Sequence, residues 1–400
     1  MRERELRRLL LLLQAPDEAA AQRRAWQVVR AGFAERESVR WPRRHARPLL
    51  VLAAGAAVLA ATLAAVLTTP GQAVLSTIRK AIAEERVVGV RGAKPALVRL
   101  PAPGRLLVES ARGPAIVHAD GSVRRLGAYA GASWSPRGIH VVVTRGHQLV
   151  ALRASSGQVR WIRARPGLLS AARWSTSPGY RVAYLEGRDL RVIVGDGTRD
   201  RLLARSARPV GPAWRPGRGH VLAHVASSGR VMVRDADSGD LLWRSPRLAG
   251  ARDLLWSSDG RRLLAVRARG FDVFDAGGRR IATVNVSGRV VAAAFAPGDH
   301  RFSFTRTLLG RSEVALLDAD HARRRPRVIF AGAGLFSDLA WSPDGRWLLV
   351  GWRSADQWLF IRSVGVRRIV AYSGMSRQFD PGARRARGFP RVAWDAWCCR

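Results

Sequence analysis

Lysine, asparagine and cysteine are scarce in this chain. Lys80 and Lys94 are its two lysines among 68 basic residues, and Asn285 is its single asparagine. The two cysteines, Cys398 and Cys399, are neighbours at the C-terminus, where the ring of a shared disulfide would be strained and no zinc-binding spacing exists. We interpret them as an intermolecular or incidental thiol pair. A disulfide framework is therefore excluded, and a chain of 400 residues that is 47% hydrophobic can bury a large core without one.

Linear catalytic motifs are missing too. The chain has no HExxH, no G-x-S-x-G and no G-x-x-x-x-G-K. His220 and His224 are four residues apart, but in a predicted strand this spacing does not build a helical metal pair. The other histidines are scattered: His45, His118, His140, His147, His300 and His321. We expect no enzymatic activity, no metal and no cofactor, and we name no site residues, although a site built from distant segments would escape such motifs.

A turn motif recurs along most of the chain. It consists of an aromatic residue, then Ser or Ala, then Pro or Asp, then Gly, and it opens an apolar stretch. The copies are WSPRG at Trp134, WSTSPG at Trp174, WRPGRG at Trp214, WSSDG at Trp256, FAPGD at Phe295 and WSPDG at Trp341. Their aromatic residues are 40, 40, 42, 39 and 46 positions apart. A period near 40 with one turn-opened β-unit per repeat is typical of a β-propeller.

The clearest copy shows what one repeat contains. Short apolar runs at 338–341, 347–352, 357–362 and 368–371 read as four strands. Between the first two, Pro343 fixes one backbone angle of a tight turn, and Asp344-Gly345 tolerate the unusual angles that follow. The repeat therefore predicts one four-stranded blade.

Third strands of three repeats end in the same residue, which is Asp235, Asp275 or Asp318. An aspartate at the start of a hairpin accepts hydrogen bonds from the turn backbone. We therefore interpret these aspartates as structural, and not as a ring of catalytic carboxylates.

The two ends of the repeat region predict how the ring closes. Residues 105–109 and 115–118 read as later strands of an incomplete blade, and residues 391–394 read as a lone first strand. Joining them would remove two open sheet edges. The prediction is an all-β propeller over residues 105–397 with seven blades, and six blades are the alternative.

The repeats resemble the WD40-like and TolB-type propeller repeats of bacteria, whose hallmark is the W-S-P-D-G turn. The resemblance covers about residues 100–397. It implies a propeller that binds other molecules. Residues 238–243 also resemble quinoprotein repeats, but no cluster of acidic metal ligands accompanies them.

Positive charge dominates, with a formal net charge of +38. Such a surface attracts polyanions through long-range fields. The arginines are dispersed and no nucleic-acid motif is present, so we expect no specific nucleic-acid binding. Anionic lipid head groups or cell-wall polymers are better candidates, and much of the basic surface is expected to be ordinary solvated surface.

One segment predicts membrane insertion. Residues 49–67 carry no charge over 19 positions, which is enough to cross the roughly 30 Å hydrocarbon core. Eight of them are alanines, and a buried soluble helix is the alternative. We place a transmembrane helix at 49–69. Arginines are denser before it than after it, which favours a cytoplasmic N-terminus and an extracytoplasmic propeller.

The segments on either side of this span are short. Residues 1–48 form a predicted cytoplasmic helical basic head, in which Trp26 and Phe33 belong to an apolar stripe that would dock on a cytoplasmic protein or lie on the inner leaflet. Residues 70–104 form a predicted helical neck and proline-containing linker. This layout is similar to that of membrane-bound anti-sigma regulators. Their zinc-type head is excluded, because this head has His45 and no cysteine.

Three functions follow from these features. The sequence favours a non-catalytic, membrane-anchored extracytoplasmic propeller that binds an envelope protein or an anionic polymer. A transmembrane signalling regulator with the propeller as sensor is one alternative, and an envelope enzyme with its site in the propeller channel is another. The enzyme alternative predicts acidic residues or histidine in the channel.

Overall fold

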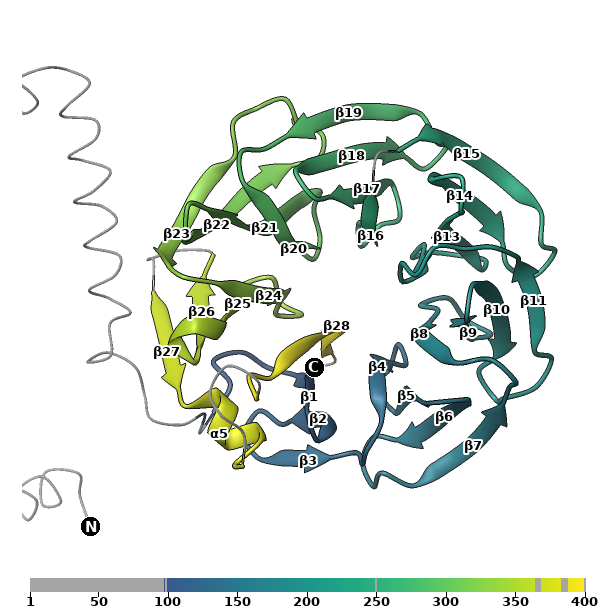
Figure 1. Ribbon diagram of the computed structural model, residues 1–400, viewed down its shortest axis with the longest axis horizontal. Helices are drawn as coiled ribbons and strands as arrows, with labels where there is room; N and C mark the ends of the chain where they lie inside the picture. Colours follow the sequence, from purple (N-terminus) through teal and green to yellow (C-terminus); the bar gives the residue numbers. More distant parts are fainter. Residues whose placement is uncertain (1–96, 98, 249, 364–367, 383–387, 399–400) are drawn as a thin grey trace, which may run out of the picture. The chain divides into compact units, whose positions relative to one another are not determined.

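The computed structural model describes residue 97 and residues 99–248, 250–363, 368–382 and 388–398. Their strands form seven four-stranded sheets arranged in a ring (Figure 1). This confirms the seven-bladed all-β propeller, and the six-bladed alternative is wrong. The predicted head (1–48), span (49–69) and most of the neck (70–96) lie outside the described residues.

Six blades are continuous in the sequence, and each runs from its innermost strand to its outermost. The first is β4 (Ala130–Trp134), β5 (His140–Arg145), β6 (Gln148–Arg153) and β7 (Val159–Ala164). The second is β8 (Leu169–Trp174), β9 (Arg181–Glu186), β10 (Asp189–Val194) and β11 (Arg201–Ala204). The third is β12 (Ala213–Trp214), β13 (Val221–Val225), β14 (Arg230–Asp235) and β15 (Leu241–Arg247).

The other three complete blades follow the same plan. The fourth is β16 (Ala251–Trp256), β17 (Arg262–Arg267), β18 (Gly270–Asp275) and β19 (Arg280–Asn285). The fifth is β20 (Arg289–Phe295), β21 (Arg301–Leu308), β22 (Arg311–Asp318) and β23 (Arg327–Ala333). The sixth is β24 (Phe336–Trp341), β25 (Trp347–Trp352), β26 (Gln357–Arg362) and β27 (Ile369–Ser373).

The closing blade joins the two ends of the repeat region. It comprises β28 (Arg391–Cys398), β1 (Arg105–Ser110), β2 (Gly113–Val117) and β3 (Val123–Arg125) in that order. β28 pairs antiparallel with β1, with Leu106 opposite Trp397 and Val108 opposite Val392. The prediction that a late strand completes the early blade is therefore confirmed. Cys398, at the end of β28, is disulfide-bonded.

Hydrogen bonds explain why the recurrent turn opens each blade. In the sixth blade the Ser342 N–H donates to the Trp347 carbonyl (2.8 Å), and the Trp347 N–H donates to Ser342 Oγ (2.9 Å). Asp344 Oδ1 accepts the Arg346 N–H at 3.1 Å. Asp235, Asp275 and Asp318 each accept backbone N–H groups of their own turns, as the sequence predicted for these strand ends.

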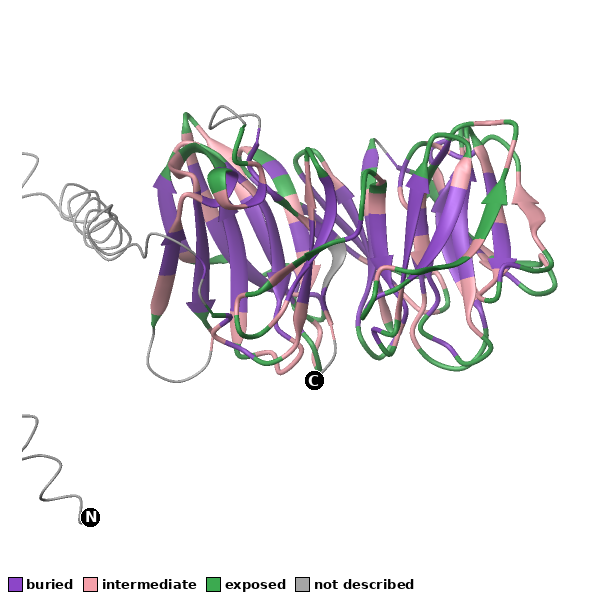
Figure 2. Cartoon of the chain, turned by 90° about the horizontal axis from the view of Figure 1, so that it is seen from below, coloured by how far each residue is buried: buried purple, intermediate pink, exposed green. Residues whose placement is uncertain are grey.

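The core lies between neighbouring sheets. Figure 2 shows buried residues along the middle of the strands and exposed residues in the connections at both faces. Between the fourth and fifth blades, Phe271 packs edge-on against Phe302 and Phe304, with ring centroids 5.1 and 5.0 Å apart. Such apolar packing between blades needs neither metal nor disulfide.

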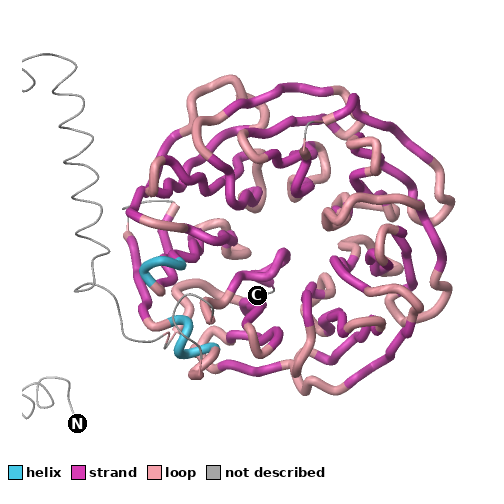
Figure 3. The backbone as a smooth tube through the Cα atoms, viewed as in Figure 1, coloured by secondary structure: helices cyan, strands magenta, loops and turns pink. Residues whose placement is uncertain are grey.

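Two short helical segments interrupt the strands (Figure 3). They are η1 (Arg353–Ala355) and α5 (Met375–Phe379), and the sequence did not predict either. Within the described residues, neither these nor any other helix has the length and apolar character that crossing a bilayer requires.

The blade topology gives the ring two distinct faces. We call face A the side that carries the turns between first and second strands and between third and fourth strands, such as 135–139 and 195–200. We call face B the side that carries the hairpins between second and third strands and the connections between blades, such as 309–310 and 334–335.

Candidate functional site

The central channel encloses about 700 Å³ and is lined mainly by the innermost strands. Its lining includes three carboxylates: Glu109, Asp253 and Asp338. Each has a structural partner, since Glu109 Oε1 accepts the Ala132 N–H (2.9 Å) and Asp253 Oδ1 accepts the Leu254 N–H (2.9 Å). Asp338 accepts hydrogen bonds from Ser337 Oγ and from a backbone N–H of β28. The acids that the enzyme alternative expected are present, and two of them, Glu109 and Asp338, join neighbouring blades through these contacts.

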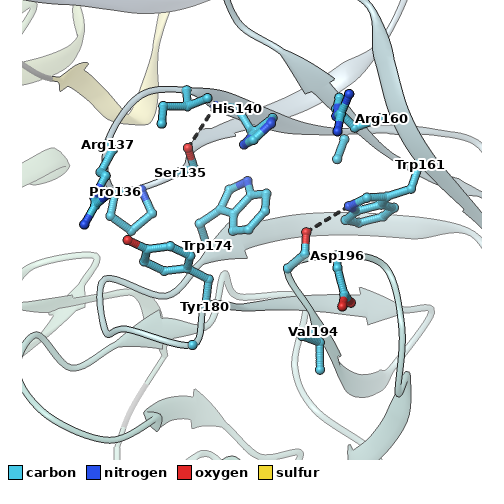
Figure 4. Close-up of a pocket in the computed structure, with 14 residues that line it drawn as sticks. Ser135, Pro136, Arg137, His140, Arg160, Trp161, Trp174, Tyr180, Val194 and Asp196 are labelled. Carbon is cyan, nitrogen blue, oxygen red and sulfur yellow. Dashed lines mark hydrogen bonds between the residues drawn. The ribbon is translucent and has the colours of Figure 1, made fainter.

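A second cavity of about 520 Å³ lies on face A between the first and second blades (Figure 4). We call it the aromatic notch. The side chains that define it are Arg137, His140, Arg160, Trp161, Trp174 and Tyr180. The first four come from the first blade, and Trp174 and Tyr180 flank the β8–β9 turn of the second. Three large aromatic rings thus meet at one blade junction.

Glycines allow the two blades to approach so closely here. Trp161 Nε1 donates to the Gly195 carbonyl at 2.9 Å. A Cβ at Gly195 would lie 2.6 Å from the Trp174 ring, and one at Gly197, where φ is +86°, would lie 2.9 Å from the Trp161 ring. The β10–β11 turn therefore sits directly against both indoles, and the notch has rigid aromatic walls.

His140 contributes an uncharged ring to the notch. Its imidazole stacks on Trp174, with centroids 6.5 Å apart and an interplanar angle of 24°. Burial lowers the pKa of His140, and the charges of Arg160 and Arg153 lower it further. The imidazole is consequently neutral at neutral pH and adds to the aromatic surface.

The charge at the rim of the notch is positive. Arg137 and Arg160 are exposed, and neither has an ion pair or hydrogen bond to the described part of the chain. The one carboxylate of the lining, Asp196, is committed to its own turn: Oδ1 accepts the Thr198 N–H at 2.9 Å and Thr198 Oγ1 at 2.6 Å. These hydrogen bonds lower the pKa of Asp196, so it stays ionised without pairing with either arginine.

The contact made by Trp161 recurs two blades away without the same surroundings. Trp243 in β15 donates its Nε1 to the Ala276 carbonyl at 3.1 Å, and its ring packs against Gly278. Trp243 is not part of the notch lining. A tryptophan of the outermost strand thus joins neighbouring blades at both places, and at the later one it does so outside the notch.

Histidines serve structure elsewhere on face A. His220 Nδ1 lies 2.6 Å from Asp237 Oδ2, and Arg181 of the preceding blade pairs with Asp237 Oδ1 at 2.9 Å. The same arrangement recurs where His300 Nδ1 lies 2.7 Å from Asp320, which also pairs with Arg262 of the preceding blade. Within the described residues no group of His, Cys, Asp or Glu could hold a metal ion.

Sequence reasoning did not find the notch. Its aromatic residues, Trp161, Trp174 and Tyr180, fall within 20 positions, but they belong to two blades and to different parts of the repeat. Trp161 lies outside the recurrent motif altogether. A search for aromatic residues that deviate from the repeat pattern would have identified it.

Comparison with known proteins supports the fold and no more. No family model matches the chain. No curated protein matches it either. Among solved structures 1477 chains match, which indicates a widespread architecture. One is the β-propeller domain of Cps50 (Swd1) from Myceliophteria thermophila, with a TM-score of 0.50 and 13% identity over 63% of this chain and 93% of that chain. The described region is a WD40-like β-propeller.

Proposed function

We propose that this chain is a bacterial, membrane-anchored, extracytoplasmic propeller of the TolB-like type that serves as a non-catalytic binding platform, and that the aromatic notch holds part of an anionic sugar polymer. The observation that carries the ligand class is the pairing of aromatic walls with Arg137 and Arg160. Neither guanidinium group has an ion pair or a hydrogen bond to the described residues. The anchor rests on the uncharged run at 49–67 alone.

The chemistry of the notch fits such a ligand. Sugar rings present flat faces of C–H groups, which pack on indole and phenol rings. Guanidinium groups bind carboxylates and phosphates with paired, charge-assisted hydrogen bonds. A neutral His140 leaves these two arginines as the positively charged side chains of the lining, beside the ionised Asp196 that its own turn holds. An overall charge of +38 would further concentrate a polyanion near the surface.

The test is a binding titration on the full chain in detergent. Polygalacturonate is the anionic probe and dextran the neutral one, and binding is measured by isothermal titration calorimetry. We expect polygalacturonate to bind and dextran not to bind. Trp161→Ala should weaken binding by roughly fivefold or more, since loss of an aromatic anchor at a binding site costs upward of about 1 kcal/mol.

Trp243→Ala is the matched control. It removes a tryptophan with the same inter-blade hydrogen bond, so it reproduces the structural damage without touching the notch. The double variant Arg137→Gln/Arg160→Gln should bind polygalacturonate more weakly, and its affinity should change less with salt concentration. Equal losses in Trp161→Ala and Trp243→Ala, or equal binding of dextran and polygalacturonate, would refute the proposed ligand site.

The signalling and enzyme alternatives stay predictions. Signalling requires a cytoplasmic partner of residues 1–48, and loss of that partner in Trp26→Ala or Phe33→Ala would support it. An enzyme in the channel would need a carboxylate free for chemistry. Turnover of an envelope polymer by the full chain would support it.

A further inference from the structure

Three of the most exposed leucines lie on face B. Leu309 in the β21–β22 hairpin has a relative exposure of 105%, Leu168 in the β7–β8 connection 64%, and Leu335 in the β23–β24 connection 51%. Leu309 and Leu335 are close neighbours, because the Gly334 N–H donates to the Gly310 carbonyl at 2.8 Å. Leu168 lies at least three blades away around the ring. The leucines therefore project from two separate places on one side of the ring.

Leu309 occupies a backbone conformation that leucine rarely adopts. Its φ is +45°, in the left-handed region where a side chain is strained and glycine or asparagine is usual. Full exposure means that no packing within the described structure compensates this strain. Positive φ at both Leu309 and Gly310 fits a two-residue hairpin turn, so the turn accounts for the backbone, whereas the apolar side chain of Leu309 is left uncovered by the described structure.

Exposed arginines flank both places. The Leu168 carbonyl accepts the N–H of Gly187 at 2.8 Å, which places Leu168 next to Arg188, while Arg145 adjoins Gly146, whose carbonyl accepts the Leu169 N–H. Leu335 donates its N–H to Ser354 Oγ at 2.8 Å and so lies next to Arg353. All three of these arginines are exposed.

The carboxylates at the connections of face B have partners within the chain. In the hairpins and connections that the structure describes there, each is engaged: Glu186 by the Gly167 N–H (3.0 Å), Asp189 by Arg205 (3.8 Å), Asp356 by Ser376 Oγ (2.6 Å) and Asp380 by Arg112 (3.1 Å). Face B therefore combines projecting leucines with exposed arginines, while its described connection carboxylates are held by contacts within the chain.

We propose that face B docks on an anionic lipid bilayer, with Leu168, Leu309 and Leu335 inserted at the boundary of head groups and acyl chains. Apolar side chains that enter this boundary among basic residues bind anionic membranes through both forces. A soluble protein partner would not need leucines that project singly from separate loops. The inference is independent of the aromatic notch, which lies on face A.

Hydrogen–deuterium exchange on the full chain tests this docking. The chain is mixed with one of two kinds of vesicle. One contains phosphatidylcholine alone, and the other contains about 30% of the anionic lipid phosphatidylglycerol in phosphatidylcholine. We expect amides of 308–311 and 167–169 to exchange several-fold more slowly with phosphatidylglycerol than without it. The variant Leu168→Ser/Leu309→Ser/Leu335→Ser should abolish this difference.

Two control variants show whether the leucines and the arginines of face B both take part in docking. Ile139→Ser replaces an apolar residue of 50% exposure on face A and should leave the protection unchanged. Arg145→Gln/Arg188→Gln/Arg353→Gln should reduce it without altering the leucines. Equal exchange in both lipid mixtures, or protection of the 135–139 turn instead, would overturn the proposal. Protection that appears without lipid and grows with protein concentration would show self-association and overturn it as well.

Discussion

The Asp338 carboxylate in β24 accepts the backbone N–H of Val392 in β28, 54 residues further along the chain. β24 is the innermost strand of the sixth blade and β28 the innermost strand of the closing blade. A Cβ at Gly351 would lie 2.4 Å from Asp338 Oδ1, so the glycine leaves room for the carboxylate. Asp338 thus ties the last complete blade to the strand that closes the ring.

Removing the Asp338 side chain should weaken this closure. At about pH 4, where the carboxyl is protonated, Asp338→Ala leaves the partly buried Val392 N–H without its acceptor, which costs about 1–3 kcal/mol in the free energy of unfolding. Urea denaturation followed by fluorescence measures the loss. Asp240→Ala, at an exposed turn position, is the control and should change stability by less than about 0.5 kcal/mol. Equal effects of the two substitutions would show that the contact does not stabilise closure.

Asp338 should also make stability depend on pH. Burial raises its pKa to about 6, from an ordinary 3.8, so the folded chain holds this proton more tightly than the unfolded chain. The resulting contribution to stability is fully present below about pH 3.8 and is lost as the pH rises through about 6. The amide introduced by Asp338→Asn would not titrate, so the variant should lack this pH dependence.

The comparison of Asp338→Asn with the original chain measures this effect. Between about pH 4 and pH 7 the stability of the variant relative to the original should rise, by up to about 3 kcal/mol for a shift of about two pKa units. Asp240→Asn should show no such trend. A difference between variant and original that stays flat across this range would mean that Asp338 is ionised throughout.

The sequence predicted the architecture because the repeat is local. Each copy of the turn carries its own hydrogen-bonding residues, such as Ser342 and Asp344, and these define the start of a blade without reference to the rest of the chain. The closing strand was also predictable, because unpaired strands at both ends of a repeat array expose edges. The repeat period and the two open strand edges together predict seven blades.

The aromatic notch and the role of Asp338 could not be predicted in this way. Both depend on which side chains of neighbouring blades meet, and this is decided by the registers and twists of separate sheets. Asp338 reads in the sequence as an ordinary polar residue before an apolar run, and nothing local indicates that Val392 is its partner. Helix α5 was missed because it lies in a blade connection outside the repeat.

His300 should make a pH-dependent contribution of its own. Partial burial lowers its pKa, but hydrogen bonds and charges of Asp320 and Asp259 outweigh this and raise it above the ordinary 6.5. The protonated imidazole therefore stabilises the fold below about pH 6.5, and this contribution is lost as the pH rises through the higher pKa of the folded state. His300→Gln should lower the melting temperature by a few degrees at about pH 6 and by much less at about pH 9.

His321→Gln is the comparison for that substitution. His321 also lies near a carboxylate, Asp318 at 3.1 Å, but its side chain is 56% exposed and joins no second blade. Its effect on the melting temperature should be small at both pH values. If His300→Gln lowers the melting temperature equally at both, the histidine acts through packing and not through its charge.

Two hairpin glycines should differ in how far they tolerate alanine. Gly187 and Gly270 both have positive φ, +58° and +152°. Around Gly187 nothing lies within 4 Å of the place that a Cβ would take. Gly187→Ala should therefore cost only the roughly 1–2 kcal/mol needed to hold alanine in the left-handed backbone conformation. A Cβ at Gly270 would lie 2.0 Å from the Val284 carbonyl oxygen, which is bonded into the β18–β19 pairing. Gly270→Ala must displace that strand and should cost roughly 2–4 kcal/mol, measured by urea denaturation. A cost at Gly270 no larger than at Gly187 would show that β19 moves away freely, and that the outermost strand of this blade is held less firmly than its pairing indicates.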